Sequence, residues 1–212
     1  MEKFLFIIIA YLIGSIPFSY LLGKFIKKDD IRKHGSGNLG ATNAFRVFGV
    51  LIGVLVMILD TLKSGLFIPI VSSMEANGID MFHPMIYGGV AVLGHIFPVW
   101  MKFKGGKGVA SAFGIMIFYY WPIPVILLPI FIAIVAISKY VSLGSITVAI
   151  AAFISGLILL FVNHPIINGH FISVEFVIVV GILMIIILIK HSSNIKRLLA
   201  GNENRVAFKK KV

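Results

Sequence analysis

The chain has 212 residues, of which 59% are hydrophobic and only 13% are charged, and its mean hydropathy is +1.04. A soluble domain of this size does not bury so large an apolar fraction, so the composition excludes a soluble globular protein and indicates a polytopic membrane protein. In a membrane protein, the formal net charge of +11 indicates basic cytosolic loops, or a site that binds anionic head groups or an anionic substrate. No nucleic-acid partner is expected. Because cysteine is absent, disulfides, thiolate nucleophiles and cysteine metal sites are excluded.

The apolar segments are continuous rather than alternating, which predicts an all-α transmembrane helical bundle instead of a β-barrel. The first segment lacks a small-residue cleavage site and continues to Leu22, so we interpret it as a retained helix rather than a signal peptide. Helix breaks are predicted near Pro17 and Pro124. Polar interruptions give seven candidate spans, at residues 4–23, 49–73, 83–100, 109–121, 123–138, 143–162 and 174–190.

The fourth and fifth spans are short, and an alternative interpretation fuses them into one kinked helix. With seven spans and the N-terminus outside, all 19 Lys and Arg residues lie on the cytosolic side except Lys3 and Lys63. Fusing the two spans would instead divide the basic residues evenly between the two sides. The positive-inside rule therefore predicts about seven spans, an outside N-terminus and a cytosolic C-terminus. The sequence contains no internal repeat or low-complexity segment, so we expect a single membrane domain of residues 1–212.

A polar, glycine-rich block separates the first two spans, at residues 34–46. It contains the pattern G-x-G-x-x-G, but it follows a membrane helix rather than a strand, so a dinucleotide site is not indicated. Its glycines let the backbone wrap closely around a ligand, and its arginine can hold a phosphate through two parallel hydrogen bonds. A flexible loop is the alternative interpretation. The candidate anion ligands are Ser36, Gly37, Asn38, Thr42, Asn43 and Arg46.

A second polar block, residues 94–109, compresses three lysines and three glycines into residues 102–108, just before the fourth span. Free backbone N–H groups and the positive end of the following helix add to its attraction for an anion. The block lacks the G-x-x-x-x-G-K-[ST] pattern of nucleotide-binding loops. Lysines that anchor lipid head groups are the alternative. The candidate substrate ligands are Lys104, Gly106 and Lys107, whereas His95 is expected to be buried with a structural role.

The last span leads into a third polar block at residues 190–205. If the helix continues, His191, Asn194 and Arg197 share one face and suit a phosphate group. A plain basic stop-transfer tail is the alternative. Ser142, just before the sixth span, adds a candidate hydroxyl on the same predicted side of the membrane.

Two charged residues, Asp60 and Lys63, lie inside the second span at positions i and i+3. Unpaired charges are costly in the bilayer, so this spacing predicts that the two residues pair with each other. The alternative is that they line a polar cavity. No H-E-x-x-H or comparable metal-ligand spacing occurs in the sequence, and no metal site is predicted.

Taken together, these separated blocks resemble one family, the bacterial acyl-phosphate:glycerol-3-phosphate acyltransferases, over nearly the whole chain and in the same order. Residues 35–43 with Arg46 resemble the first signature loop of that family, and residues 103–108 resemble the second. The third signature is matched by residues 191–195 with Arg197, Gly201 and Glu203, and two shorter segments, 14–17 and 60–63, also fit.

The resemblance implies a membrane enzyme that transfers a fatty acyl group from acyl phosphate to the 1-hydroxyl of sn-glycerol 3-phosphate. The products are lysophosphatidic acid and phosphate, and the reaction is the first step of bacterial phospholipid synthesis. The implied location is the bacterial plasma (inner) membrane, among membrane lipids, with the active site on the cytosolic face. No cofactor, metal or obligatory protein partner is expected.

We expect Lys104, His191 and Asn194 to bind the phosphate of glycerol 3-phosphate, with Ser142 as a weaker candidate. Six residues would hold the acyl phosphate and the oxyanion, namely Ser36, Gly37, Asn38, Thr42, Asn43 and Arg46. Of all these residues, His191, Ser36 and Arg46 are the predicted catalytic ones, while Gly106, Lys107 and Arg197 complete the substrate-binding set. The proton acceptor is either His191 or, preferably, a substrate phosphate oxygen, because no carboxylate partner for His191 is evident.

A transporter of organic phosphates is the rival class. It would place polar residues through both halves of the bilayer, whereas the polar blocks of this chain are all predicted to be cytosolic. The sequence therefore favours the enzyme.

Overall fold

The computed structural model describes residues 1–162 and 172–205. Every regular element in these two ranges is helical, as the composition predicts. The chain divides into two compact units, Met1–Tyr120 (unit 1) and Trp121–Val212 (unit 2). The expected single domain over residues 1–212 stays a prediction, and the basic residues 209–211 lie outside the described ranges.

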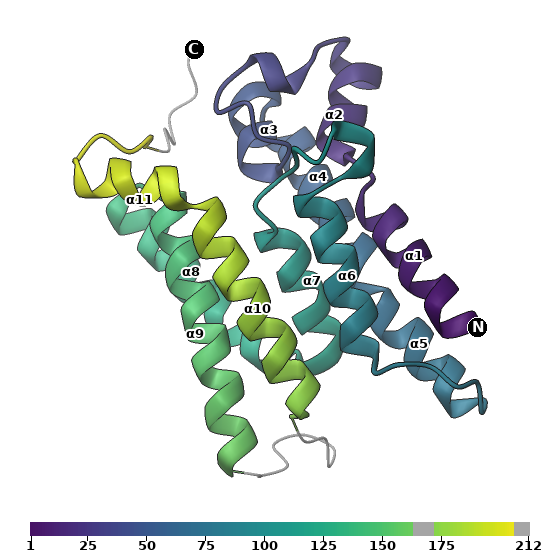
Figure 1. Cartoon of the computed structure of the whole chain (residues 1–212). Coiled ribbons are helices and arrows are strands. Elements are labelled where there is room, and N and C mark those ends of the chain that lie inside the picture. The colour runs from purple at the N-terminus through teal and green to yellow at the C-terminus, as the bar shows by residue number, and fades with distance from the viewer. Residues whose placement is uncertain (163–171, 206–212) are drawn as a thin grey trace. The chain divides into compact units, whose positions relative to one another are not determined.

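Unit 1 contains seven α-helices and three short turns of other helix types (Figure 1). Its α-helices are α1 (Glu2–Gly14), α2 (Phe18–Leu22), α3 (Ala41–Phe48), α4 (Val50–Gly65), α5 (Phe67–Ala76), α6 (Pro84–Ile96) and α7 (Val109–Tyr120). The short turns are η1 (Gly23–Lys27), η2 (Ile31–Lys33) and η3 (Val99–Met101).

Proline explains two helix breaks in unit 1. α1 ends at Gly14 and α2 begins immediately after Pro17, as the sequence predicts, because proline has no N–H and its ring clashes with the preceding turn. The predicted second span is likewise interrupted at Leu66, between α4 and α5. Pro69 lies four residues after Gly65, so its ring displaces the carbonyl that would continue the helix.

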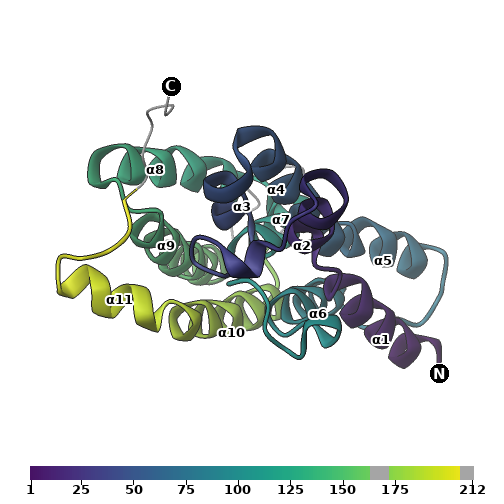
Figure 2. The same ribbon diagram turned by 90° about the horizontal axis from the view of Figure 1, so that it is seen from above.

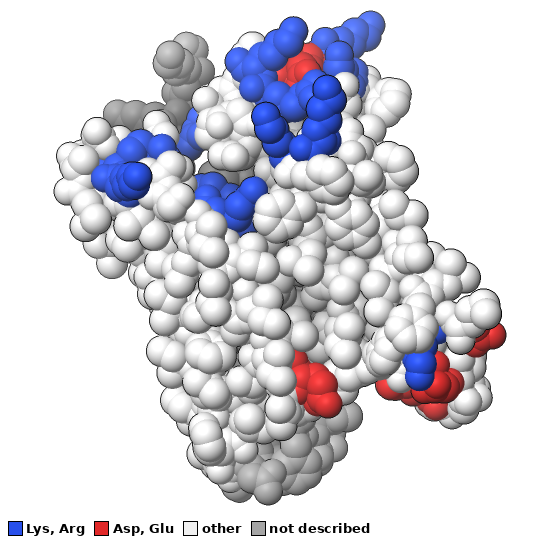
Figure 3. Space-filling model, viewed as in Figure 1, with Lys and Arg blue, Asp and Glu red and all other residues white. Residues whose placement is uncertain are grey.

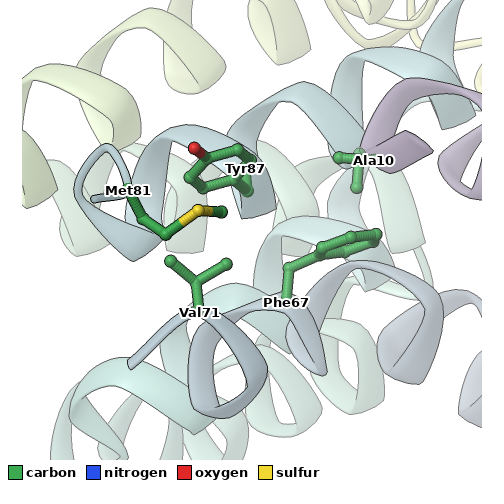
Figure 4. Packing of buried hydrophobic residues seen from close by; sticks show 6 residues of the cluster. Ala10, Phe67, Val71, Met81 and Tyr87 are labelled. Atoms are coloured by element: carbon green, nitrogen blue, oxygen red, sulfur yellow. The ribbon is translucent and has the colours of Figure 1, made fainter. Parts of the chain in front are cut away.

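The core of unit 1 forms where α1, α5 and α6 meet. Its buried cluster consists of Ala10, Phe67, Val71, Met81, Tyr87 and Ala91 (Figure 4). The Tyr87 hydroxyl donates to the carbonyl of Lys3 at 3.2 Å, so its polar tip is satisfied. α1 lies beside α6 in both views (Figures 1 and 2), and this close approach needs Gly14, where a Cβ would overlap the backbone of Ala91.

Unit 1 has an acidic end and a basic end (Figure 3). At the acidic end, Lys3 near the N-terminus pairs with Asp80 in the α5–α6 connection at 2.6 Å. The opposite end of unit 1 carries residues 23–49 and the connection from α6 to α7, which hold the first two polar blocks. Within unit 1, both glycine-rich blocks therefore share one end, as the predicted topology requires.

Unit 2 contains α8 (Pro122–Ser138), α9 (Val141–Val162), α10 (Val174–Lys190) and α11 (Ser192–Leu199). α9 packs against both α8 and α10 (Figure 2). The predicted helix break near Pro124 is present and lies at Trp121, between α7 and α8, while Pro124 itself lies in the first turn of α8. Proline is tolerated there because the first N–H groups of a helix have no partner within it.

The apolar helices match the predicted spans in position. Within residues 1–162 and 172–205, four helical stretches are long and apolar enough to cross a membrane: Glu2–Lys27, Val50–Ala76, Pro84–Met101 and Val141–Val162. A fifth is formed if α10 and α11, which are bent by 57°, count as one span. α7 and α8 are apolar but shorter. The count of seven crossings and the orientation of the termini stay predictions.

Candidate functional site

In unit 1, the loop of residues 34–40 (loop 1) folds around the side chain of Asn43, which is 2% exposed in the first turn of α3. The Asn43 Oδ1 accepts a hydrogen bond from the Ser36 N–H at 2.9 Å. Its Nδ2 donates to the carbonyl oxygens of His34 and Asn38, both at 3.2 Å. A buried amide that satisfies several backbone groups fixes the loop conformation. The structure thus gives Asn43, a predicted substrate ligand, an organising role within loop 1.

Loop 1 needs glycine at two of the three positions of its G-x-G-x-x-G pattern. Gly35 and Gly37 have φ angles of +60° and +70°, which side chains rarely adopt. A Cβ at Gly35 would also overlap the Oδ1 of Asn43. At Gly40, by contrast, φ is −163° and no atom lies within 4 Å of the place that a Cβ would occupy. The pattern is therefore explained by the turn around Asn43.

Two carboxylates beside loop 1 are engaged by side chains of their own segment. The Arg32 guanidinium donates hydrogen bonds to both carboxylate oxygens of Asp30, from Nε to Oδ1 at 2.9 Å and from Nη2 to Oδ2 at 2.6 Å. This guanidinium lowers the pKa of Asp30 from 3.8 to about 2. Asp29 pairs with His34 at 2.9 Å, and a hydrogen bond from the Asp30 N–H lowers the pKa of the Asp29 carboxyl. Both acids are thus occupied within their own segment.

Three predicted site residues of this segment, Ser36, Thr42 and Arg46, are exposed. The guanidinium of Arg46 forms no hydrogen bond or ion pair with any group in residues 1–162 or 172–205. The side chain of Asn38 donates from Nδ2 to the Ser36 Oγ at 3.3 Å. An uncompensated guanidinium beside a glycine loop is suited to binding a phosphate or carboxylate.

The second polar block forms a tight loop, residues 97–108 (loop 2), against the end of α6. Lys102 and Phe103 both adopt left-handed φ angles, +52° and +60°, a strained conformation for side chains of this size. Two backbone hydrogen bonds stabilise this conformation, from the Phe103 N–H to Pro98 O at 2.9 Å and from the Lys104 N–H to Met101 O at 3.1 Å. The Lys104 side chain is exposed, and Lys107 is half-buried.

Gly106 joins loop 2 to loop 1. Its N–H donates to the carbonyl of His95 at 3.2 Å, and a Cβ at this position would overlap the His95 ring. The same Cβ would lie 2.6 Å from the carbonyl oxygen of Leu39 in loop 1. Leu39 and the partly buried Met101 share one hydrophobic cluster. Loops 1 and 2 therefore pack together, and the exposed Arg46 and Lys104 belong to the same end of unit 1.

The charged residues of the second predicted span are buried and paired, as the sequence indicates. The Lys63 Nζ lies 2.8 Å from the Asp60 Oδ1, and the His95 Nδ1 lies 3.4 Å from the same oxygen. All three side chains are less than a tenth exposed. The predicted burial of His95 is thereby confirmed.

In unit 2, the carboxylate of Glu203 gathers three predicted site residues. Its Oε1 accepts hydrogen bonds from the Asn194 Nδ2 at 2.7 Å and the Ser142 Oγ at 3.2 Å. Its Oε2 accepts from the Arg197 Nε at 2.8 Å. Glu203 is 8% exposed and links α9, α11 and the chain that follows α11. This cluster fixes the third polar block within unit 2.

His191 lies at the bend between α10 and α11 and is 2% exposed. Its Nδ1 lies 2.8 Å from the carbonyl oxygen of Ile187, which can only accept, so the proton of the neutral ring is assigned to Nδ1. The Nε2 atom is then the one that can take up a proton or, once protonated, donate to an anion.

Glu203 was not among the predicted site residues, although it is the only acid in the basic block of residues 190–205. A lone carboxylate among cations is a signal that could have identified it. Its partner Ser142 lies 61 residues away in the sequence, so no local spacing predicts the cluster. In the described part of the chain, no group of three His, Cys, Asp or Glu residues is arranged to hold a metal ion.

The fold and these loops together define a helical integral membrane protein with exposed cations on glycine-rich loops, a class suited to phosphate-bearing substrates near a bilayer. Residues 4–201 match the family model described as glycerol-3-phosphate acyltransferase. The chain therefore belongs to the glycerol-3-phosphate acyltransferase family, and it is an integral membrane acyltransferase of that family.

Relatives and solved structures agree with this assignment. The chain is 41% identical to glycerol-3-phosphate acyltransferase 2 of Thermotoga maritima, over 97% of each chain. It is 40% identical to the glycerol-3-phosphate acyltransferase of Bacillus subtilis, over 96% of this chain and 97% of the relative. The crystal structure of PlsY (YgiH), an integral membrane glycerol 3-phosphate acyltransferase, in its glycerol 3-phosphate form is 38% identical, with a TM-score of 0.82 and coverage of 98% and 96%. The lysophosphatidic acid form of that enzyme gives 37% identity and a TM-score of 0.80.

Proposed function

We propose that this acyltransferase uses an acyl phosphate as donor and acylates the 1-hydroxyl of sn-glycerol 3-phosphate. The solved relative has a glycerol 3-phosphate form and a lysophosphatidic acid form, which supports this acceptor and this product. The observation that carries the proposal is the basic end of unit 1, where Arg46 and Lys104 are exposed beside two packed glycine loops. Both proposed substrates bear a phosphate that such cations bind.

The reaction requires no covalent intermediate with the protein. The acceptor hydroxyl oxygen attacks the carbonyl carbon of the acyl phosphate, the bond from that carbon to the phosphate oxygen breaks, and inorganic phosphate leaves. The hydroxyl proton passes to a phosphate oxygen of the substrate, or to His191. Because the donor is already a mixed anhydride, the protein acts by positioning the two substrates and by stabilising the developing oxyanion.

We assign the donor phosphate and the oxyanion to loop 1 and α3, with Arg46 as the charged ligand and Ser36 and Thr42 as neutral ones. All three side chains are exposed, which supports direct contact with substrate. Lys104 of loop 2 is assigned to the phosphate of glycerol 3-phosphate. Gly37 and Asn38 of loop 1 are assigned to the acyl phosphate as well. Gly106 and Lys107 of loop 2 complete the substrate-binding set.

The residues of unit 2 keep their predicted roles as proposals of the same kind. Asn194, Ser142 and Arg197 each use a donor on Glu203. The hydroxyl of Ser142 has only this one donor, so a contact with the substrate phosphate would require Ser142 to release Glu203. Arg197 retains both Nη groups for contact with substrate. The Nδ1 of His191 is held by the carbonyl oxygen of Ile187, and we assign the reacting or binding role to its Nε2.

We place the enzyme in the bacterial plasma membrane, with the basic end of each unit facing the cytosol. In unit 1 that end carries both glycine loops, and in unit 2 it carries Lys190, Lys196 and Arg197 at and beyond the end of α10. Cytosolic loops are enriched in Lys and Arg, which supports this orientation.

A comparison of donors tests the proposal. Purified protein in lipid nanodiscs would be supplied with glycerol 3-phosphate and with palmitoyl phosphate, palmitoyl-CoA or palmitoyl-acyl carrier protein in separate reactions. We expect lysophosphatidic acid from palmitoyl phosphate alone. Equal or faster product formation from the CoA or carrier-protein donor would overturn the assignment of the donor.

A further inference from the structure

One turn of α4, formed by Asp60, Thr61, Lys63 and Ser64, carries four polar side chains in the interior of unit 1 (the α4 polar turn). Asp60, Lys63 and Ser64 are buried, with exposures of 2%, 7% and 0%. Every one of the four side chains bonds to a group outside α4, and those groups lie in three different segments of unit 1. So many polar groups in one buried turn call for a physical reason beyond packing.

The first contact of the α4 polar turn is with the break between α1 and α2. The Lys63 Nζ donates to the carbonyl oxygen of Ile16 at 2.8 Å, and it lies 5.5 Å from the centre of the Phe18 ring. Pro17 interrupts the helix here and leaves carbonyl groups without a helical partner. Lys63 satisfies one of them while it is paired with Asp60.

The second contact is with the start of α7, immediately after loop 2. The Thr61 Oγ1 donates to Ala110 O at 3.2 Å, and the Ser64 Oγ donates to Ser111 O at 2.8 Å. In return, the Ser111 Oγ donates to the carbonyl oxygen of Asp60 at 3.0 Å. These reciprocal bonds fix where the chain leaves loop 2.

The third contact is with the end of α6, immediately before loop 2. The Asp60 Oδ1 lies 3.4 Å from the His95 Nδ1, and the other side of the His95 ring meets Gly106 so closely that a Cβ there would overlap Nε2. The His95 carbonyl also accepts the Gly106 N–H at 3.2 Å. The α4 polar turn therefore contacts the chain just before loop 2, at His95, and just after it, at Ala110 and Ser111, and through His95 it reaches Gly106 within the loop.

We propose that the α4 polar turn is a positioning device for loop 2, and that the Asp60–His95 contact sets the place of Gly106 and the adjoining lysines. The inference rests on the proposed function, in which loop 2 binds glycerol 3-phosphate through Lys104. A buried ion pair is often replaceable by apolar residues without loss of stability, so stability alone does not account for Asp60 and Lys63. A misplacement of about 1 Å in a binding group can cost about 100-fold in rate. The need to position loop 2 therefore accounts for Asp60 and Lys63 better than stability does.

The test removes both charges of the pair together. Asp60→Leu/Lys63→Met leaves no unpaired buried charge, so we expect it to fold and to unfold thermally close to wild type, unlike either single change. Its kcat/KM for glycerol 3-phosphate should fall by about 100-fold, mainly through KM for that substrate, with KM for palmitoyl phosphate little changed. Asp60→Asn/Lys63→Met keeps a side-chain oxygen for His95 and should recover part of the loss.

A second readout does not depend on turnover. Hydrogen–deuterium exchange of residues 102–108 should be faster in Asp60→Leu/Lys63→Met than in wild type, while loop 1 exchanges as before. The matched control is Lys3→Met/Asp80→Asn, which removes an ion pair from the acidic end of unit 1 and should change neither readout.

Two results would overturn the inference: a folded Asp60→Leu/Lys63→Met variant with wild-type KM for glycerol 3-phosphate, or unchanged exchange in residues 102–108. If the wild-type protein itself releases no phosphate from palmitoyl phosphate in the presence of glycerol 3-phosphate, the proposed function fails. The exchange measurement still decides whether the α4 polar turn holds loop 2.

Discussion

At Arg46, an exposed guanidinium has no partner in the described part of the chain, so its removal should affect activity and leave stability unchanged. We expect Arg46→Ala to lower kcat/KM by at least about 100-fold, the range seen when one donor to a developing oxyanion is lost. Arg46→Lys should recover only a small part, because lysine cannot form two parallel bonds to a phosphate. Thermal unfolding in detergent should be the same for all three proteins, and a large drop in the unfolding temperature would contradict this role.

The Asp30–Arg32 pair gives a prediction about pH. The folded-state pKa of Asp30 is depressed from 3.8 to about 2, so its stabilising contribution is present above pH 3.8 and is lost as the pH falls toward 2. The contribution should be about 1 kcal/mol, because the Arg32 side chain is 47% exposed and solvent screens the pair.

Unfolding temperatures of wild type and Asp30→Asn should therefore differ at neutral pH, and the difference should shrink steadily below about pH 4. A difference that stays constant down to pH 2 would show that the carboxylate charge is not what stabilises loop 1. The matched variant is Asp80→Asn, whose carboxylate is 80% exposed and should contribute little.

Among the connecting elements, the structure separates glycines that the sequence pattern treats alike. Gly106→Ala places a methyl group against the His95 ring and 2.6 Å from the Leu39 carbonyl oxygen, so we expect loops 1 and 2 to move apart and activity to fall by at least tenfold, roughly 1.4 kcal/mol. Gly40→Ala meets open space and should leave the unfolding temperature unchanged. Equal unfolding temperatures and equal activities for the two variants would contradict the packing of loop 2 on His95.

Some features of these loops and of the helices beside them can be predicted from the sequence, and others cannot. The pairing of Asp60 with Lys63 and the break at Pro17 follow from local rules, and the structure confirms both. The organising role of Asn43 does not follow, because an amide in a polar block serves a ligand and a loop equally well until its partners are known. Glu203 is hidden for a related reason, since its Ser142 partner comes from a distant helix.

At the scale of the whole molecule, seven crossings would place residues 33, 139 and 192 on the cytosolic side and residue 77 outside. The chain lacks cysteine, so single substitutions Lys33→Cys, Lys139→Cys, Ser192→Cys and Asn77→Cys report each position without background. We expect a membrane-impermeant thiol reagent to reach only Asn77→Cys in intact cells, and all four after lysis. Labelling of Lys139→Cys and Ser192→Cys from outside would instead support fusion of the fourth and fifth spans.

Composition and charge predict the class of fold well, because every apolar run must satisfy its backbone as a helix in lipid. Helix ends are harder, since proline ends a helix or begins one according to its position. Pro17 ends α1, whereas Pro122 and Pro124 sit in the first turn of α8, where their missing N–H groups matter little.

Phosphate release is the sharpest test of the proposal that this chain acylates glycerol 3-phosphate from acyl phosphate. Purified protein would be incubated with palmitoyl phosphate, with and without glycerol 3-phosphate, beside Arg46→Ala and His191→Ala. We predict release that requires glycerol 3-phosphate, matches lysophosphatidic acid one to one and is lost in both variants. No turnover by folded protein, together with passage of glycerol 3-phosphate across liposome membranes, would contradict the claim and identify a transporter.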